Sequence, residues 1–218
     1  MEEEIRILFL AAGAGDENRQ HLLEREAREI DKRLHVGTNR DSFKLITEWE
    51  VRARDLQEIL LRHQPHIVHL SGQGTKEGDI VLAHDPENSR TVDRRAVADL
   101  IRILKDNIHL IVFNDHHTQQ LAQEVKEIID YTVSMSETVN VENAITFFTY
   151  FYQALSFGRT IVEAFDLGKN QLRLEGETDY KKPVLHVRDA ADMSWPPLER
   201  PNVRRPAKTA KIWAAGSA

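Results

Sequence analysis

The sequence of 218 residues contains no cysteine. This absence excludes disulfide bonds, zinc sites built from thiolates and a thiol nucleophile together. Stability must therefore come from packing and hydrogen bonds. Whatever fold the chain adopts, a cysteine protease mechanism is impossible for it.

Long apolar runs are also missing. No run approaches the roughly 18 residues that a membrane-spanning helix needs. The chain starts with the acidic stretch Met1-Glu2-Glu3-Glu4, which is the opposite of the basic start of a signal peptide. We therefore expect a soluble, cytoplasmic protein with no membrane partner.

Basic residues are outnumbered by acidic residues over most of the chain. The formal net charge is −6, and residues 189–218 hold five basic and three acidic side chains, which leaves −8 on residues 1–188. An acidic body is a poor general binder of nucleic acid, so no nucleic-acid partner is expected. The content of 41% hydrophobic and 29% charged residues is that of an ordinary globular protein.

The apolar residues alternate between two patterns along residues 1–188. Short apolar runs predict buried strands, and helical spacing of apolar residues predicts helices between them. The strands are expected at 5–12, 42–51, 67–71, 109–113, 131–136 and 183–187, with a small hairpin near 80–88. The helices are expected at 23–34, 55–63, 93–104, 121–129 and 141–157, with one more from 158. This order predicts one α/β domain, with a mostly parallel sheet covered by helices on both faces.

Two predicted helices contain residues that packing against the core does not account for. The charged run 24–33 is most simply a solvated helix face. In the helix 141–157, the core face takes the phenylalanines, which leaves Tyr150 and Tyr152 for a second surface. That surface is either ordinary partial exposure of amphipathic rings or a partner site.

The periodic pattern stops at Val187. Prolines at 196, 197, 201 and 206 and scattered basic residues follow, so residues 189–218 are expected to form a tail or linker. We expect its removal to leave the domain folded. Trp195 and Trp213 could anchor it on the acidic body or on a second copy in a homo-oligomer.

Polar residues follow two of the predicted central strands. One strand runs into Ser71-Gly72-Gln73-Gly74, and the next runs into Asn114-Asp115-His116-His117. Open α/β sheets bind ligands at the carboxyl ends of their strands. We therefore expect a binding cleft there, made of His69, Ser71, Gly72, Gln73, Gly74, Asn114, Asp115, His116 and His117.

Three sequence segments resemble bacterial CHAT domains and occur in the order found in that family. These domains belong to the caspase-like superfamily of clan CD cysteine peptidases. The segments run from Ile7 to Ile30, from Asp55 to Gly74, and from Val112 to Phe165. Together they cover about residues 5–175, and no one of them would be specific alone. The resemblance implies a caspase-like three-layer αβα sandwich.

In an active member of the superfamily, a histidine base stands at the position of Gln73 and a cysteine nucleophile at the position of His116. Neither is present here, and an amide can act neither as a base nor as an acid near neutral pH. The resemblance therefore implies a pseudo-protease that binds a protein or peptide, in a bacterial signalling or defence setting.

An alternative is a hydrolase in which a metal held by His69, Asp115 and His116 activates water. Adjacent histidines point in different directions, however, and no His-x-x-x-His spacing fixes them together. Gly13-Ala14-Gly15 lacks the third glycine of a dinucleotide-binding turn, and no Lys-Ser or Lys-Thr follows it. We therefore expect no metal and no cofactor.

Overall fold

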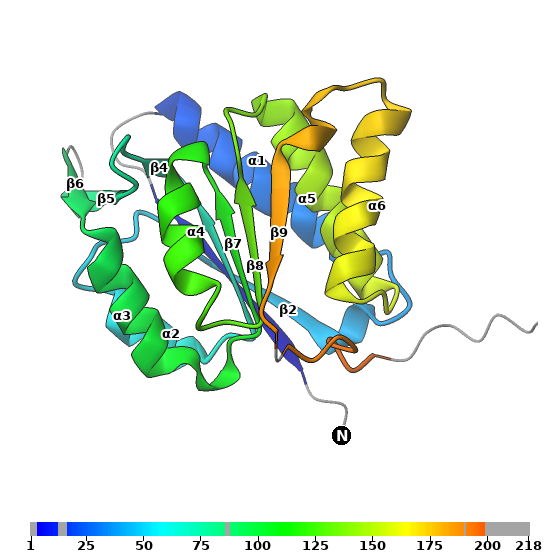
Figure 1. Ribbon diagram of the computed structural model, residues 1–218, viewed down its shortest axis with the longest axis horizontal. Helices are drawn as coiled ribbons and strands as arrows, with labels where there is room; N and C mark the ends of the chain where they lie inside the picture. Colours follow the sequence, from blue (N-terminus) through cyan, green and yellow to red (C-terminus); the bar gives the residue numbers. More distant parts are fainter. Residues whose placement is uncertain (1–3, 13–16, 86–87, 190, 199–218) are drawn as a thin grey trace, which may run out of the picture.

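The computed structural model describes residues 4–12, 17–85, 88–189 and 191–198; at 17, 84, 85, 88 and 116 only the backbone is described. A six-stranded sheet of order β2-β1-β3-β7-β8-β9 forms the centre (Figure 1). Its strands are β1 Ile5–Ala11, β2 Phe43–Glu48, β3 Ile67–Ser71, β7 Leu110–Asn114, β8 Tyr131–Met135 and β9 Pro183–Val187. Only β9 is antiparallel to its neighbour, which confirms the predicted mostly parallel sheet.

Helices cover both faces of this sheet (Figure 1). One face carries α1 Glu17–Leu34, α5 Val141–Ser156 and α6 Ile161–Leu174, and the other carries α2 Leu56–His63, α3 Arg94–Leu104 and α4 Gln119–Val125. Successive strand side chains point to opposite faces. Ile7 and Phe9 of β1 therefore pack with α1 and α5, and Leu8 and Leu10 pack with the other helices. The three-layer αβα sandwich is confirmed.

A small antiparallel sheet lies beyond the carboxyl end of β3. It consists of β4 Gln73–Gly74, β5 Ile80–Asp85 and β6 Asn88–Val92. The predicted hairpin is confirmed, although residues 86 and 87 of its turn lie outside the described residues. Asp93 then caps α3, because its carboxylate accepts a hydrogen bond from the backbone N–H of Arg95 at 2.7 Å. Short 3-10 helices at η1 Arg40–Ser42, η2 Lys105–Asn107, η3 His116–Thr118 and η4 Asp179–Lys181 complete the described structure.

The prediction of a second surface on α5 is wrong for Tyr152, which is completely buried. A helix at the rim of a fold buries one stripe, but α5 lies on the sheet between α1 and α6 and buries most of its circumference. Tyr150 stays partly exposed, and the guanidinium of Arg33 lies 4.9 Å from the centre of its ring.

The packed chain runs past the predicted boundary at Arg188, at least to Leu198. The side chain of Trp195 is 6% exposed and stacks on His109 with ring centres 4.8 Å apart. The hydroxyl of Tyr131 donates to the carbonyl of Asp192 at 2.7 Å. Prolines end regular secondary structure but do not prevent burial of a large aromatic side chain.

Two other predictions concern residues that the structure does not describe. Trp213 and the rest of 199–218 lie outside the described residues, as does the turn at 13–15. Within the described residues, no helix combines the length and apolar character that crossing a membrane requires.

Candidate functional site

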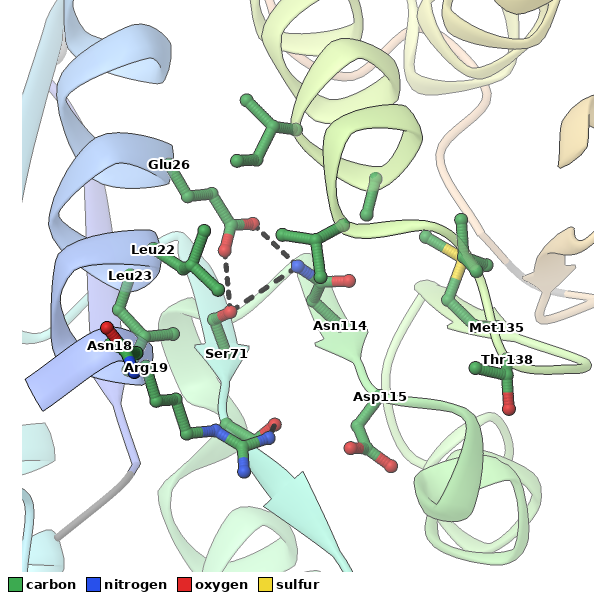
Figure 2. A pocket seen from close by; sticks show the side chains of 15 residues that line it. Asn18, Arg19, Leu22, Leu23, Glu26, Ser71, Asn114, Asp115, Met135 and Thr138 are labelled. Atoms are coloured by element: carbon green, nitrogen blue, oxygen red, sulfur yellow. Dashed lines mark hydrogen bonds between the residues drawn. The ribbon is translucent and has the colours of Figure 1, made fainter. Parts of the chain in front are cut away.

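A pocket of about 410 Å³ opens at the carboxyl ends of β3, β7 and β8, between α1 and α5 (Figure 2). This is the edge of a parallel sheet at which α/β proteins bind ligands. The pocket is lined by Asn18, Arg19, Leu22, Leu23, Glu26, Ser71, Gly72, Asn114, Asp115, Met135, Thr138, Val139, Val141, Ala144 and Ile145.

Strand register builds the polar floor of the pocket. Ser71 of β3 lies opposite Asn114 of β7, and both side chains point toward α1. Glu26 reaches down from α1: its Oε2 accepts from the hydroxyl of Ser71 at 2.6 Å, and its Oε1 accepts from the amide of Asn114 at 2.8 Å (Figure 2). A carboxylate that is only 3% exposed thus receives two side-chain donors from two strands.

His69 lies beneath this floor and does not line the pocket. It precedes Ser71 by two residues on β3, so it points to the same face but deeper, and it is completely buried. Its ring stacks on Phe9 with centres 4.9 Å apart and meets the ring of Phe148 edge-on at 4.7 Å. The sequence-based placement of His69 in an open cleft is therefore wrong.

Both ring nitrogens of His69 face polar atoms. Nδ1 lies 3.0 Å from the hydroxyl of Tyr152, and Nε2 lies 3.1 Å from Oε1 of Glu26, at ion-pair distance but without the alignment of a hydrogen bond. Burial, and secondarily the charge of Glu26, raise the pKa of Tyr152 well above 10. The tyrosine therefore stays protonated and can donate to Nδ1.

Arg19 of α1 closes one rim of the pocket. Its Nη1 donates to Oε1 of Gln73 at 2.8 Å, and its Nη2 donates to the carbonyl oxygen of Gly72 at 2.9 Å. Gly72 itself presses against β1, because a Cβ on it would lie 2.5 Å from the carbonyl oxygen of Ala12. The side chain of Gln73 is exposed, and its acceptor oxygen is held by an arginine.

The polar segments 71–74 and 114–117 meet at this edge of the sheet. A Cβ on Gly74 would lie 2.8 Å from Cβ of His117, so β4 and η3 are in direct contact. Oδ1 of Asp115 accepts from the backbone N–H of His117 at 2.7 Å and so caps η3. The side chain of His116 lies outside the described residues, and its facing of Gln73 stays a prediction.

The predicted site residues thus fall into groups. Ser71, Gly72, Asn114 and Asp115 line the pocket, whereas Gln73, Gly74 and His117 lie in the adjoining β4–η3 contact. Sequence reasoning missed Glu26 because the charged run 24–33 was assigned to a solvated face, and it missed Arg19 because the helix was predicted to start only at residue 23. The available signal was position: Glu26 lies between Leu23 and Ile30, on the helix face that points to the core.

The metal-binding alternative finds no supporting geometry in the described side chains. Among them, no group of three His, Asp or Glu side chains is placed to hold a metal ion. The ring nitrogens of His69 face Tyr152 and Glu26, and one carboxylate oxygen of Asp115 caps η3.

No protein-family model matches the chain, and no curated protein is similar to it in sequence. Among solved structures, the chain is similar to the secreted C11 cysteine protease "iotapain" from Bacteroides thetaiotaomicron, with 9% identity and a TM-score of 0.48. That match covers 70% of this chain and 58% of the protease, so the chain spans little more than half of the protease's length.

The chain is also similar to two pyridoxal kinases. The match to the Bacillus subtilis enzyme in its ADP complex has 8% identity and a TM-score of 0.39, and covers 77% of this chain and 90% of that one. The match to the Staphylococcus aureus enzyme with pyridoxal has 10% identity and a TM-score of 0.38, and covers 76% and 85%. These similarities concern the α/β arrangement of the chain and not its activity.

Proposed function

We propose that this chain is a non-catalytic, caspase-like module of the CHAT type, which binds a protein or peptide partner in the pocket between α1 and α5. One observation carries the proposal: the pocket lies at the ligand-binding edge of the sheet, while the chain has no cysteine to react there. The proposal includes a bacterial signalling or defence setting, which rests on the CHAT resemblance. It also includes assembly with a second copy, which rests on the composition of residues 189–218.

The remaining polar groups of the site favour binding over catalysis. Gln73 cannot act as an acid or base near neutral pH, and its carbonyl oxygen accepts a hydrogen bond from Arg19. Ser71 is the hydroxyl on the floor, but it is only 2% exposed and donates a hydrogen bond to Glu26. A nucleophile must reach its substrate, and this hydroxyl has almost no access to one.

The shape of the site suits a peptide. Its volume of about 410 Å³ lies within the range of ordinary ligand pockets, and it lies between two helices at the surface. Val141, at the start of α5, remains 46% exposed at its edge. A side chain of a partner can therefore enter while the partner's backbone stays outside.

The test compares peptide binding before and after the pocket is filled. Peptides selected from a random phage-displayed library on the native chain should bind at least about tenfold more weakly to Ala144→Trp, because the indole occupies the pocket. Ile103→Trp is the matched control, since residue 103 is 73% exposed on α3, on the other face of the sheet. Near-ultraviolet circular dichroism verifies that both variants fold.

Two results would overturn the proposal. One is equal binding of the selected peptides to the native chain and to a folded Ala144→Trp variant. The other is hydrolysis of generic peptide or ester substrates by the native chain that Ala144→Trp abolishes, which would make the pocket an active site.

A further inference from the structure

The walls of the pocket between α1 and α5 are apolar. Leu22 and Leu23 line it from α1, and Met135 lines it from the end of β8 (Figure 2). Ala144 and Ile145 line it from α5. Water in such a space gains little from its walls, and an apolar group that displaces it is stabilised.

The polar side chains of the floor already form hydrogen bonds with one another. Both oxygens of Glu26 accept hydrogen bonds from the strands, and Oε1 also lies 3.1 Å from Nε2 of His69. A carboxylate offers about four acceptor positions, of which these two hydrogen bonds fill about half, and the remainder have little access because Glu26 is only 3% exposed. A polar ligand group reaching the floor would have to break bonds that the protein makes within itself.

Charge at the pocket disfavours ionised ligand groups of either sign. The guanidinium of Arg19 lies on the rim, where a basic side chain would meet like charge. The carboxylates of Glu26 and Asp115 also line the pocket, where an acidic side chain would meet like charge, and both already accept hydrogen bonds within the protein. Desolvating any of these ions without a full set of partners is costly.

From these contacts we infer that the pocket takes an apolar side chain of the partner, for which leucine and methionine serve as probes. The inference rests on the proposed function and names the chemical class that the site selects. Burial of such a side chain raises affinity by roughly 10- to 100-fold over the same ligand with alanine.

The test uses small probes that isolate the side chain. N-acetyl N-methylamides of leucine, methionine, alanine, arginine and aspartate are each titrated to about 10 mM and observed by saturation-transfer NMR, since binding at this strength is in the millimolar range. We expect the leucine and methionine amides to bind about tenfold or more better than alanine, and the arginine and aspartate amides no better than alanine.

Val139→Trp supplies the pocket control, because Val139 lines the pocket from a loop, is only partly buried and tolerates a larger side chain more easily than a helix position. It should abolish the leucine signal, while Ile103→Trp should not. If Val139→Trp does not fold, displacement of the leucine amide by a library-selected peptide gives the same information.

Three outcomes overturn the inference. The arginine or aspartate amide binds best; no amide binds better than alanine; or the leucine amide binds equally to a folded Val139→Trp variant. In each case the library-selected peptides still decide the proposed function separately, because they report whether the pocket binds any partner.

Discussion

The two faces of the central sheet bury different kinds of side chain. The face under α1, α5 and α6 holds most of the aromatic core residues and a connected set of polar groups, Glu26, His69, Ser71, Asn114 and Tyr152. The face under α2, α3 and α4 is almost entirely aliphatic, with Phe113 as the aromatic member among the described residues. The pocket belongs to the polar face. The polar residues that line the pocket and the buried network beneath them are thus concentrated on one side, and the other side supplies mainly aliphatic packing.

The aliphatic face also buries polar side chains. Thr132 and Ser134 alternate on β8 with Val133, so they point away from α5, and both are completely buried. Among the described residues, neither hydroxyl has a hydrogen-bond partner. The contrast is one of degree, because Nε2 of His69 and the hydroxyl of Thr149 on α5 also lack a hydrogen-bond partner among the described residues.

The largest expected effect concerns residues 189–198, whose Trp195 belongs to the core on the polar face of the sheet. A chain ending at Arg188 loses Trp195, and we expect its free energy of unfolding to fall by about 3–5 kcal/mol, as for other large buried aromatic groups. A chain ending at Leu198 keeps this segment and serves as the control. Urea unfolding followed by circular dichroism measures both, and equal midpoints would show that the segment contributes nothing to the polar face.

A smaller effect is expected inside the polar network. Tyr152→Phe removes the hydroxyl that faces Nδ1 of His69, and leaving a buried group without its partner should cost about 1–3 kcal/mol. Tyr150→Phe, on the same helix but partly exposed, should change stability by less than about 0.5 kcal/mol. A loss no greater for Tyr152→Phe than for Tyr150→Phe would mean that the network is not stabilising.

Tyr152→Phe should also change how the free energy of unfolding depends on pH. The pKa of Tyr152 is raised in the folded protein, so its contribution is fully present below pH 10 and is lost as pH rises through the folded pKa. Above pH 10 the unfolded chain releases this proton and the folded chain keeps it, which lowers stability by about 1.4 kcal/mol per pH unit. Tyr152→Phe should flatten the decline by that amount.

The smallest effect is expected on the aliphatic face and has the opposite sign. Thr132→Val replaces an unpartnered buried hydroxyl with a methyl group of nearly equal volume, and should stabilise the fold by about 1 kcal/mol. Thermal unfolding at one scan rate compares the variant with the native chain. Destabilisation by Thr132→Val would indicate that the hydroxyl has a bound water as its partner, and that the faces differ less than proposed.

The sequence predicted the sheet well because buried strands and helices carry different periodicities. Ser71 and Asn114 could be placed at the site because parallel strands end at one edge. The position of Glu26 on the core-facing side of its helix was readable, but its role was not, because its partners lie on two distant strands. Trp195 was named as a possible anchor, but its contact with His109 could not be foreseen, and the burial of Tyr152 was missed because it depends on neighbouring helices that are distant in sequence.

The glycines of the phrase Ser71-Gly72-Gln73-Gly74 are held in place by neighbours that take no part in chemistry. Gly72 leaves no room for a Cβ beside Ala12, and Gly74 leaves none beside His117. A side chain at either position would meet these neighbours whatever the pocket binds, so the two glycines report the course of the backbone. A search for the glycines alone would therefore identify a backbone shape and not an activity.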